Sequence, residues 1–192
     1  RSSDRPDKKM LTFFYSAMNA GKTTMLLGSA HNYEQRKKKV LLLTSSFDTR
    51  FGKNVIKSRT GIQKSCVHYT NECNLKTFLK SNLPLECVFI DEAQFLTHNQ
   101  VWQLVEFIAE ENVPVKCYGL RTDFNGNVFE GSKILLGIAD DLVHVKTICD
   151  CGEYATMNKL LVKESDTQIQ IGGDNMYESI CRNCWLESNN KT

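Results

Sequence analysis

The chain has 192 residues, of which 41% are hydrophobic and 24% charged, and its formal net charge is +2. This composition is typical of a globular protein with one main core and a small appendage, and the near-neutral charge does not indicate nucleic acid or a membrane surface as a partner. No apolar run approaches the roughly 18 residues needed to span a membrane, and the opening RSSDRPDKK does not resemble a signal peptide. We therefore expect a cytoplasmic protein.

The first predicted element is an apolar strand that ends at about Ser16 and leads through a loop into a helix, in the stretch FFYSAMNAGKTTMLL. The P-loop pattern G-x-x-x-x-G-K-[ST] fits at Gly21, Lys22 and Thr23, but Ser16 stands where the pattern has its first glycine. The backbone N–H groups of such a loop converge at a helix N-terminus and attract phosphate. We expect Lys22 to bridge the β- and γ-phosphates of a nucleotide and Thr23 to ligate Mg²⁺. The alternative is an ordinary strand-to-helix turn.

Further strands and helices follow in alternation. The basic run Arg36 to Lys39 falls where the first helix should end, and VWQLVEFIAEE has helical spacing. Strands are predicted at Val40–Thr44, Cys87–Asp91, Pro114–Gly119 and Leu142–Ile148, and residues 47–64 are expected to form a mobile polar loop. This order predicts an α/β fold with a mainly parallel sheet and helices on both faces.

Two adjacent carboxylates follow the strand in CVFIDE. A P-loop needs a carboxylate at the end of a neighbouring strand to hold Mg²⁺, and Asp91 is suitably placed for this role. Glu92 lies past the strand tip, where it can take a proton from the group that attacks the γ-phosphate. Water as the nucleophile would make the protein an ATPase, and a substrate hydroxyl would make it a kinase. The alternative for Glu92 is a solvated loop carboxylate without function.

Four of the eight cysteines form close pairs, namely Cys149, Cys151, Cys181 and Cys184. In a reduced compartment, four clustered thiolates indicate a structural zinc site with no position open for water, and disulfides are the alternative. The pattern changes at Cys149 to short strands and glycines, so we place a domain boundary there. The isolated Cys66, Cys73, Cys87 and Cys117 are expected to be core or loop thiols.

Several ordered segments together resemble the type II thymidine kinases, which are cytosolic, tetrameric P-loop enzymes. These segments are FYSAMNAGKTT, FDTRFG, FIDEAQFL, CYGLRTDFNG and IGGDNMYESICRNC, and the likeness runs from about Leu11 to Trp185. The resemblance implies a RecA-like P-loop domain over residues 10–148 and a zinc-binding, lasso-bearing domain over residues 149–188. It also implies phosphorylation of thymidine, and of deoxyuridine, at the 5′-hydroxyl in pyrimidine deoxynucleotide salvage.

The resemblance assigns roles to individual residues. ATP and its Mg²⁺ would be bound by Ser16, Ala17, Met18, Asn19, Ala20, Gly21, Lys22, Thr23, Asp48, Asp91 and Gln94. Glu92 would be the catalytic base, assisted by Lys22 and by Arg50 beside the transferred phosphoryl group. Phe124 would stack on the thymine ring. Contacts to the edge of the ring would come from a loop that Tyr177 closes near the sugar, and this loop is formed by Gln168, Ile169, Gln170, Ile171 and Gly172. Packing in the core is the alternative for Phe124, and a surface ion pair is the alternative for Arg50.

The same resemblance implies a homotetramer that thymidine triphosphate inhibits by feedback. Two other classes of protein are weighed against the kinase. One is a nucleic-acid-dependent P-loop ATPase with a structural zinc appendage, which would need a basic groove. The other is a zinc module that binds protein partners and carries a vestigial P-loop.

Overall fold

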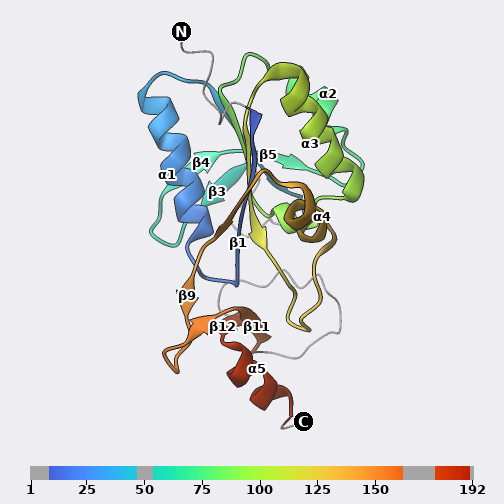
Figure 1. The fold of residues 1–192 in the computed structure, drawn as a ribbon. Coiled ribbons are helices and arrows are strands. Elements are labelled where there is room, and N and C mark those ends of the chain that lie inside the picture. The colour runs from blue at the N-terminus through green and yellow to red at the C-terminus, as the bar shows by residue number, and fades with distance from the viewer. Residues whose placement is uncertain (1–8, 47–53, 162–175, 191–192) are drawn as a thin grey trace.

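A six-stranded, wholly parallel sheet forms the centre of the molecule (Figure 1). The computed structural model describes residues 9–46, 54–161 and 176–190. In spatial order the strands are β5 (Val67–Tyr69), β2 (Val40–Ser45), β6 (Cys87–Ile90), β7 (Val115–Leu120), β1 (Leu11–Ser16) and β8 (Asp141–His144). The predicted α/β class and the parallel sheet are confirmed.

Helices cover both faces of this sheet. One face carries α1 (Lys22–Gln35), and the other carries α2 (Leu75–Lys80), α3 (His98–Glu111) and α4 (Glu130–Ile138) (Figure 1). Each face has its own hydrophobic core, and alternate residues of one strand enter different cores. In β6, Cys87 and Phe89 pack in the core under α1, whereas Val88 and Ile90 pack in the core under α3. The fully apolar sequence of β6 therefore follows from burial on both faces.

Local sequence determines where the two long helices begin. Gly21 precedes α1 with φ 85°, a left-handed conformation that glycine adopts without strain. Thr97 and Gln100 form a reciprocal capping box at the start of α3. Helix α1 ends at Gln35, directly before the basic run, as predicted.

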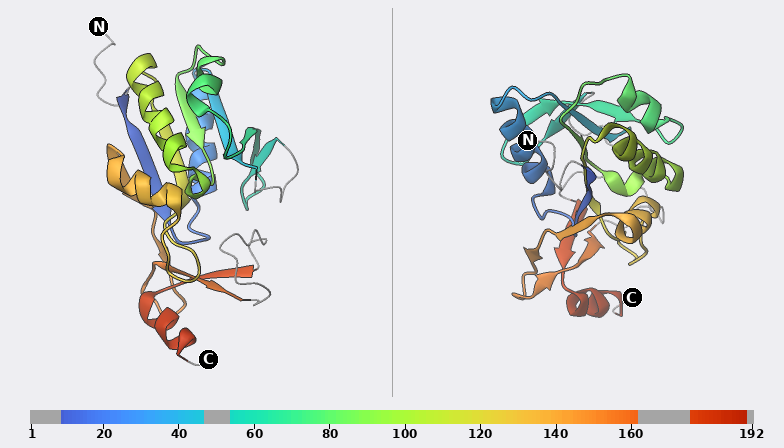
Figure 2. Two further views of the ribbon diagram at one scale, coloured as in Figure 1. Left: turned by 90° about the vertical axis from the view of Figure 1, so that its right-hand side faces the viewer. Right: turned by 45° about the horizontal axis from the view of Figure 1, so that its top comes forward.

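The segment predicted as a mobile polar loop contains a β-hairpin, so this part of the prediction was wrong. β3 (Val55–Lys57) pairs antiparallel with β4 (Gln63–Ser65), and the turn between them contains Gly61 at φ 89°. The hairpin projects from the side of the sheet (Figure 2). Its polar sequence hid the strands because only Ile56 and Ser58 of this hairpin are buried, which leaves no alternation long enough to recognise.

The C-terminal residues form a small unit beyond the carboxyl ends of the parallel strands (Figures 1 and 2). It contains two antiparallel pairs and a helix: β9 (Thr147–Ile148) with β10 (Tyr154–Ala155), β11 (Met157–Leu160) with β12 (Tyr177–Ile180), and α5 (Arg182–Asn189). The predicted continuous strand over Leu142–Ile148 was wrong, because the chain leaves the sheet after His144 and β9 pairs with β10 instead.

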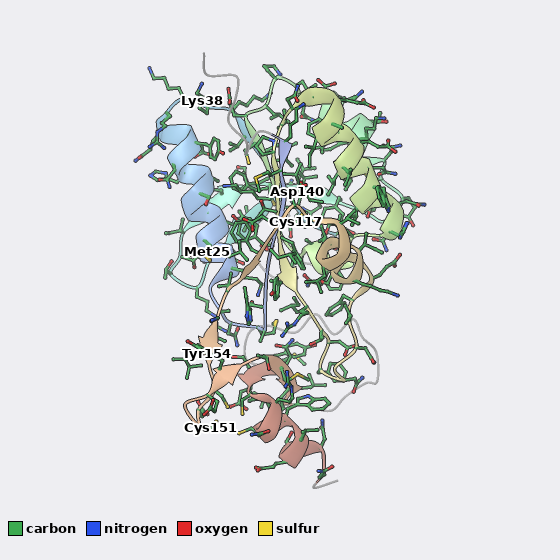
Figure 3. All side chains as sticks on the ribbon, viewed as in Figure 1. Met25, Lys38, Cys117, Asp140, Cys151 and Tyr154 are labelled. Carbon is green, nitrogen blue, oxygen red and sulfur yellow. The ribbon has the colours of Figure 1, made fainter. Side chains whose placement is uncertain are left out.

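The isolated thiols lie where the sequence placed them. Cys66, Cys87 and Cys117 are buried and Cys73 is half-buried, and none of the four forms a disulfide bond. Figure 3 shows Cys117 among the side chains at the middle of the sheet, far from Cys151 in the C-terminal unit. Within the described parts of the chain, no helix has the length and apolar character needed to cross a membrane.

Candidate active site and metal centre

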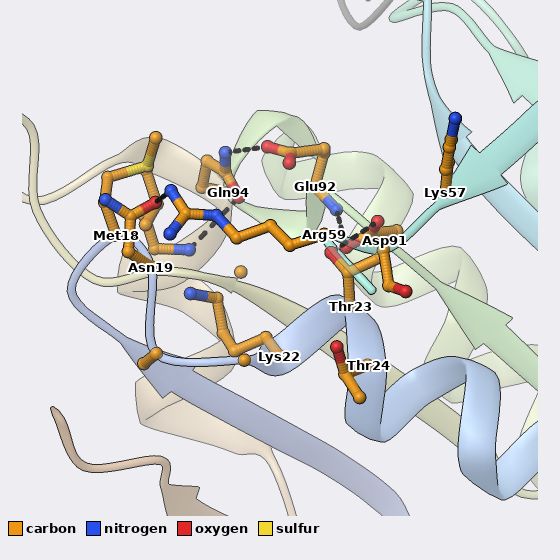
Figure 4. A pocket seen from close by; sticks show the side chains of 15 residues that line it. Met18, Asn19, Lys22, Thr23, Thr24, Lys57, Arg59, Asp91, Glu92 and Gln94 are labelled. Carbon is orange, nitrogen blue, oxygen red and sulfur yellow. Dashed lines mark hydrogen bonds between the residues drawn. The ribbon is translucent and has the colours of Figure 1, made fainter. Parts of the chain in front are cut away.

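The P-loop and the end of β6 face each other across one pocket (Figure 4). The parallel pairings place the carboxyl ends of β1 and β6 on either side of β7, at the same edge of the sheet. The predicted residues that line this pocket are Met18, Asn19, Ala20, Gly21, Lys22, Thr23, Asp91, Glu92 and Gln94. Sequence positions far apart are thus brought together as expected for a site at the ends of parallel strands.

Lys22 is half-buried at the base of the P-loop. Its ammonium donates hydrogen bonds to the hydroxyl oxygen of Ser16 and to the carbonyl oxygen of Ala17, the latter at 3.1 Å. The serine that departs from the P-loop pattern therefore holds the lysine side chain. Burial lowers the pKa of Lys22 to about 8, although the nearby carboxylates of Glu92 and Asp91 act in the opposite direction.

Thr23 and Asp91 form the second part of the site. The Thr23 hydroxyl donates to Asp91 Oδ2 at 3.4 Å, and Asp91 Oδ1 accepts the backbone N–H of Glu92 at 3.0 Å. A threonine hydroxyl beside a carboxylate oxygen offers the hard oxygen ligands that Mg²⁺ prefers. These two side chains are therefore chemically suited to hold a magnesium ion near the N-terminus of α1.

The Glu92 carboxylate is oriented by Gln94 of the short 3₁₀ helix η2 (Ala93–Phe95). The Gln94 amide nitrogen donates to Glu92 Oε2, while its oxygen accepts the backbone N–H of Leu120 at 3.1 Å. The Tyr69 hydroxyl donates to the Glu92 carbonyl oxygen at 2.9 Å, and Glu92 itself has a left-handed backbone with φ 54°. The side chains of Gln94 in η2 and Tyr69 in β5 thus fix a strained residue at the mouth of the pocket.

Several lining residues were not identified from the sequence. They are Thr24, Lys57, Ser58, Arg59, Gly119 and Leu120. Arg59 extends from the β3–β4 hairpin across the pocket and donates to the Asn19 side-chain oxygen (Figure 4). Arg59 belongs to no motif, so only the fold of the hairpin could have revealed its position.

The predicted nucleoside-binding residues are placed only in part. Phe124 is half-buried in the loop after β7, and its carbonyl oxygen accepts the indole N–H of Trp185 at 3.1 Å. Tyr177 begins β12, and its carbonyl oxygen lies 3.5 Å from the Asn19 amide nitrogen. Asp48, Arg50 and the segment Gln168–Gly172 lie outside the described residues.

The four paired cysteines converge in the C-terminal unit. The Sγ atoms of Cys149, Cys151, Cys181 and Cys184 all lie within 4.8 Å of one another, and all four are free thiols. Zinc–sulfur bonds of about 2.3 Å in a tetrahedron would place the sulfurs about 3.8 Å apart. The Cys151 and Cys181 sulfurs are 3.6 Å apart, which fits this arrangement and is far longer than a disulfide bond.

The electrostatics of the cluster also favour a cation. Backbone hydrogen bonds from Cys151 and Cys181 lower the pKa of Cys149 to about 7. Hydrogen bonds with neighbouring thiols, first that of Cys181, raise the pKa of Cys184 to about 12. Four thiols this close do not all ionise without a positive charge between them. The cluster therefore fits zinc, as predicted. Only one residue separates Cys149 from Cys151, and the tight turn after β9 nevertheless brings both thiols into the cluster.

An α/β fold with a P-loop lysine and threonine opposite paired carboxylates defines a nucleotide-dependent phosphotransferase or phosphohydrolase. Comparison with known proteins identifies the family. The family model described as thymidine kinase matches residues 9–185. A thymidine kinase from Idiomarina loihiensis is 48% identical over 186 residues, which cover 93% of this chain and 96% of the relative.

Two further relatives agree. A thymidine kinase from Rhodopirellula baltica is 48% identical over 90% of this chain and 85% of its own length. One from Zymomonas mobilis is 44% identical over 94% of this chain and 97% of its own length. The chain belongs to the thymidine kinase family. This membership makes it a kinase that uses ATP and disfavours the ATPase alternative.

Proposed function

We propose that this protein transfers the γ-phosphoryl group of ATP to the 5′-hydroxyl of thymidine, with deoxyuridine as a second acceptor. The products would be ADP and thymidine monophosphate, in pyrimidine deoxynucleotide salvage in the cytoplasm. Family membership together with the P-loop facing Asp91 and Glu92 supports this activity. The single observation that carries it is the Glu92 carboxylate, oriented by Gln94 at the mouth of the phosphate pocket.

The residues of the pocket suit distinct roles in this reaction. Ser16 to Thr23 would bind the phosphates through backbone N–H groups, the helix N-terminus and the Lys22 ammonium. Thr23 and Asp91 would hold Mg²⁺, which neutralises phosphate charge when bound. Glu92 would accept the proton of the 5′-hydroxyl as the bond to phosphorus forms. Arg50 would stabilise charge on the transferred group, and Asp48 would help to bind the ATP phosphates.

The nucleoside would bind between the P-loop and the C-terminal unit. Phe124 would stack on the thymine ring, and the segment Gln168–Gly172 with Tyr177 would supply contacts to its edge and the sugar. Stacking alone does not select a base, so hydrogen bonds to the base edge must determine specificity. We also propose that residues 10–148 form the ATP-binding domain and residues 149–188 the zinc- and nucleoside-binding domain, with β9 joining the two.

Assembly and regulation are proposed from the family resemblance. The chain would form a homotetramer, and thymidine triphosphate would inhibit it by feedback. Nucleic acid and membranes are not among the proposed partners, because the near-neutral charge gives little electrostatic attraction to either. Light scattering of the purified protein would test the tetramer, and titration with thymidine triphosphate would test the inhibition.

A turnover assay with alternative acceptors tests the central proposal. ADP production should be slow with ATP alone, and thymidine should raise it with thymidine monophosphate appearing in equal amount. Single-stranded DNA should have no effect. Stimulation by DNA and not by thymidine would favour the ATPase alternative, and turnover with neither would contradict both enzymatic functions.

A further inference from the structure

Asn158 of β11 is a buried polar residue that no motif includes, with only 2% of its surface exposed. Both ends of its side-chain amide are hydrogen-bonded to backbone groups outside the C-terminal unit. Its Oδ1 accepts the backbone N–H of Met18 at 2.7 Å, and its Nδ2 donates to the carbonyl oxygen of Thr122 at 2.9 Å. These are well-formed bonds by distance.

The two backbone groups belong to the two loops that the reaction must align. Met18 is part of the P-loop, between Ser16 and Lys22, and Thr122 lies two residues before Phe124. A primary amide is the smallest neutral side chain that presents an acceptor and a donor in one rigid plane. Asn158 therefore fixes the spacing between the phosphate loop and the loop proposed to carry the base.

β11 is itself anchored at the metal centre. Asn158 is opposite Ser179 in the β11–β12 pair. Ile180 and Cys181 follow directly and pack with Cys149 and Ala155 in a small hydrophobic cluster of the C-terminal unit. Cys181 contributes one of the four clustered thiols. A continuous route of strand pairing and hydrogen bonds thus leads from the cysteine cluster through β12 and β11 to the P-loop.

We propose that Asn158 is a positioning residue through which the C-terminal unit aligns the ATP phosphates with the nucleoside hydroxyl. The inference rests on the proposed function for its catalytic consequence, while the hydrogen bonds themselves belong to the fold. Alignment errors of about 1 Å typically cost about 10²-fold in rate. Loss of the amide should therefore reduce turnover more than it reduces the binding of either substrate alone.

The test compares Asn158→Ala with Asn158→Leu in the full chain. Both variants lose the amide, but leucine has the same branched shape as asparagine and, being larger, leaves no cavity. We expect kcat for thymidine phosphorylation to fall about 10- to 100-fold in both, with ATP affinity measured alone within about threefold of the original. The matched control is Lys159→Ala on the same strand, which should behave as the unsubstituted protein.

Hydrogen exchange supplies a readout that does not depend on catalysis. Without substrates, peptides covering the P-loop and residues 121–126 should exchange faster in both Asn158 variants, while those from α3 should not change. Unchanged exchange in the P-loop peptide would overturn the proposal. Wild-type kcat in Asn158→Leu would also overturn it, because the residue would then only fill space. Inactivity of the unsubstituted protein toward thymidine would instead count against the proposed function.

Discussion

Glu92 is the residue proposed as the catalytic base. Replacing it with glutamine keeps an oxygen that accepts from Gln94 and removes the base. We expect kcat to fall about 10²- to 10⁴-fold while ATP affinity is retained, because Lys22, Thr23 and Asp91 are untouched. Steady-state kinetics with thymidine would measure the effect, with Glu86→Gln at an exposed ion pair as control. A Glu92→Gln enzyme with more than about a tenth of the original kcat would contradict the assignment.

We expect Lys22 to make ATP binding dependent on pH in a defined window. Its pKa in the free protein is about 8, so the ammonium loses its proton as pH rises through that value. Bound phosphates favour the charged form and raise this pKa. ATP binding at pH 8 to 9 should therefore take up a proton, and affinity should fall as pH rises further.

Calorimetry in two buffers of different ionisation enthalpy would measure this uptake at a single pH. ATP binding by the Lys22→Arg variant should occur without proton uptake, because arginine stays charged. Equal heats in both buffers for the unsubstituted protein at pH 8.5 would show that Lys22 is already charged before ATP binds.

At the scale of elements, we expect the contact between β7 and η2 to determine the orientation of the Glu92 carboxylate, the proposed base. Gly119 of β7 lies so close that an added Cβ would be 2.8 Å from the Gln94 side-chain oxygen and 2.9 Å from its backbone nitrogen. The Gly119→Ala variant should displace Gln94, release the Glu92 carboxylate and lower kcat at least about 10-fold. Gly28→Ala is the matched control, since its Cβ would enter open space on α1.

Gly28→Ala should leave kcat unchanged and raise the free energy of unfolding by about 0.5–1 kcal/mol, because alanine favours the helix. Thermal or denaturant unfolding of both variants would measure stability beside the kinetics. Unaltered kcat in Gly119→Ala would mean that Gln94 moves without affecting Glu92. It would contradict the inference that Gln94 positions the Glu92 carboxylate.

Sequence patterns predicted the elements whose signal is local. The β1 strand, the P-loop turn and the apolar β6 strand before Asp91 were each recognised from a short stretch, and the structure confirms their order. The hairpin β3–β4 was missed because a polar sequence gives no alternation. Asn158 and Arg59 were missed because their roles come from backbone groups and side chains distant in sequence, and a pattern along one chain contains no such distances.

At the scale of the whole molecule, the cysteine cluster should hold the C-terminal unit together. We predict one zinc per chain by elemental analysis, because zinc closes the turn after β9 onto the start of α5. Chelation, or Cys181→Ser, should raise the KM for thymidine and speed hydrogen exchange in residues 147–160 and 177–189. Exchange in α3 should remain slow.

Cys73→Ser is the control for this prediction, because Cys73 is a free thiol outside the cluster. It should retain the metal and the kinetics of the unsubstituted protein. Freshly purified protein with stoichiometric disulfides and no metal would refute the zinc assignment.

The order of strands in the sheet also determines when the nucleotide site can form during synthesis. β1 carries the P-loop, yet its two neighbours are β7 and β8, with Leu11 opposite Val115 and Thr12 opposite Asp141. As the chain leaves the ribosome, β1 therefore remains unpaired until β7 and β8 are translated, after the other strands of the sheet. Such distant pairings form slowly, because a long loop must close first. A nascent chain would thus acquire its ATP site late in translation, shortly before the segment that contains Asn158 emerges.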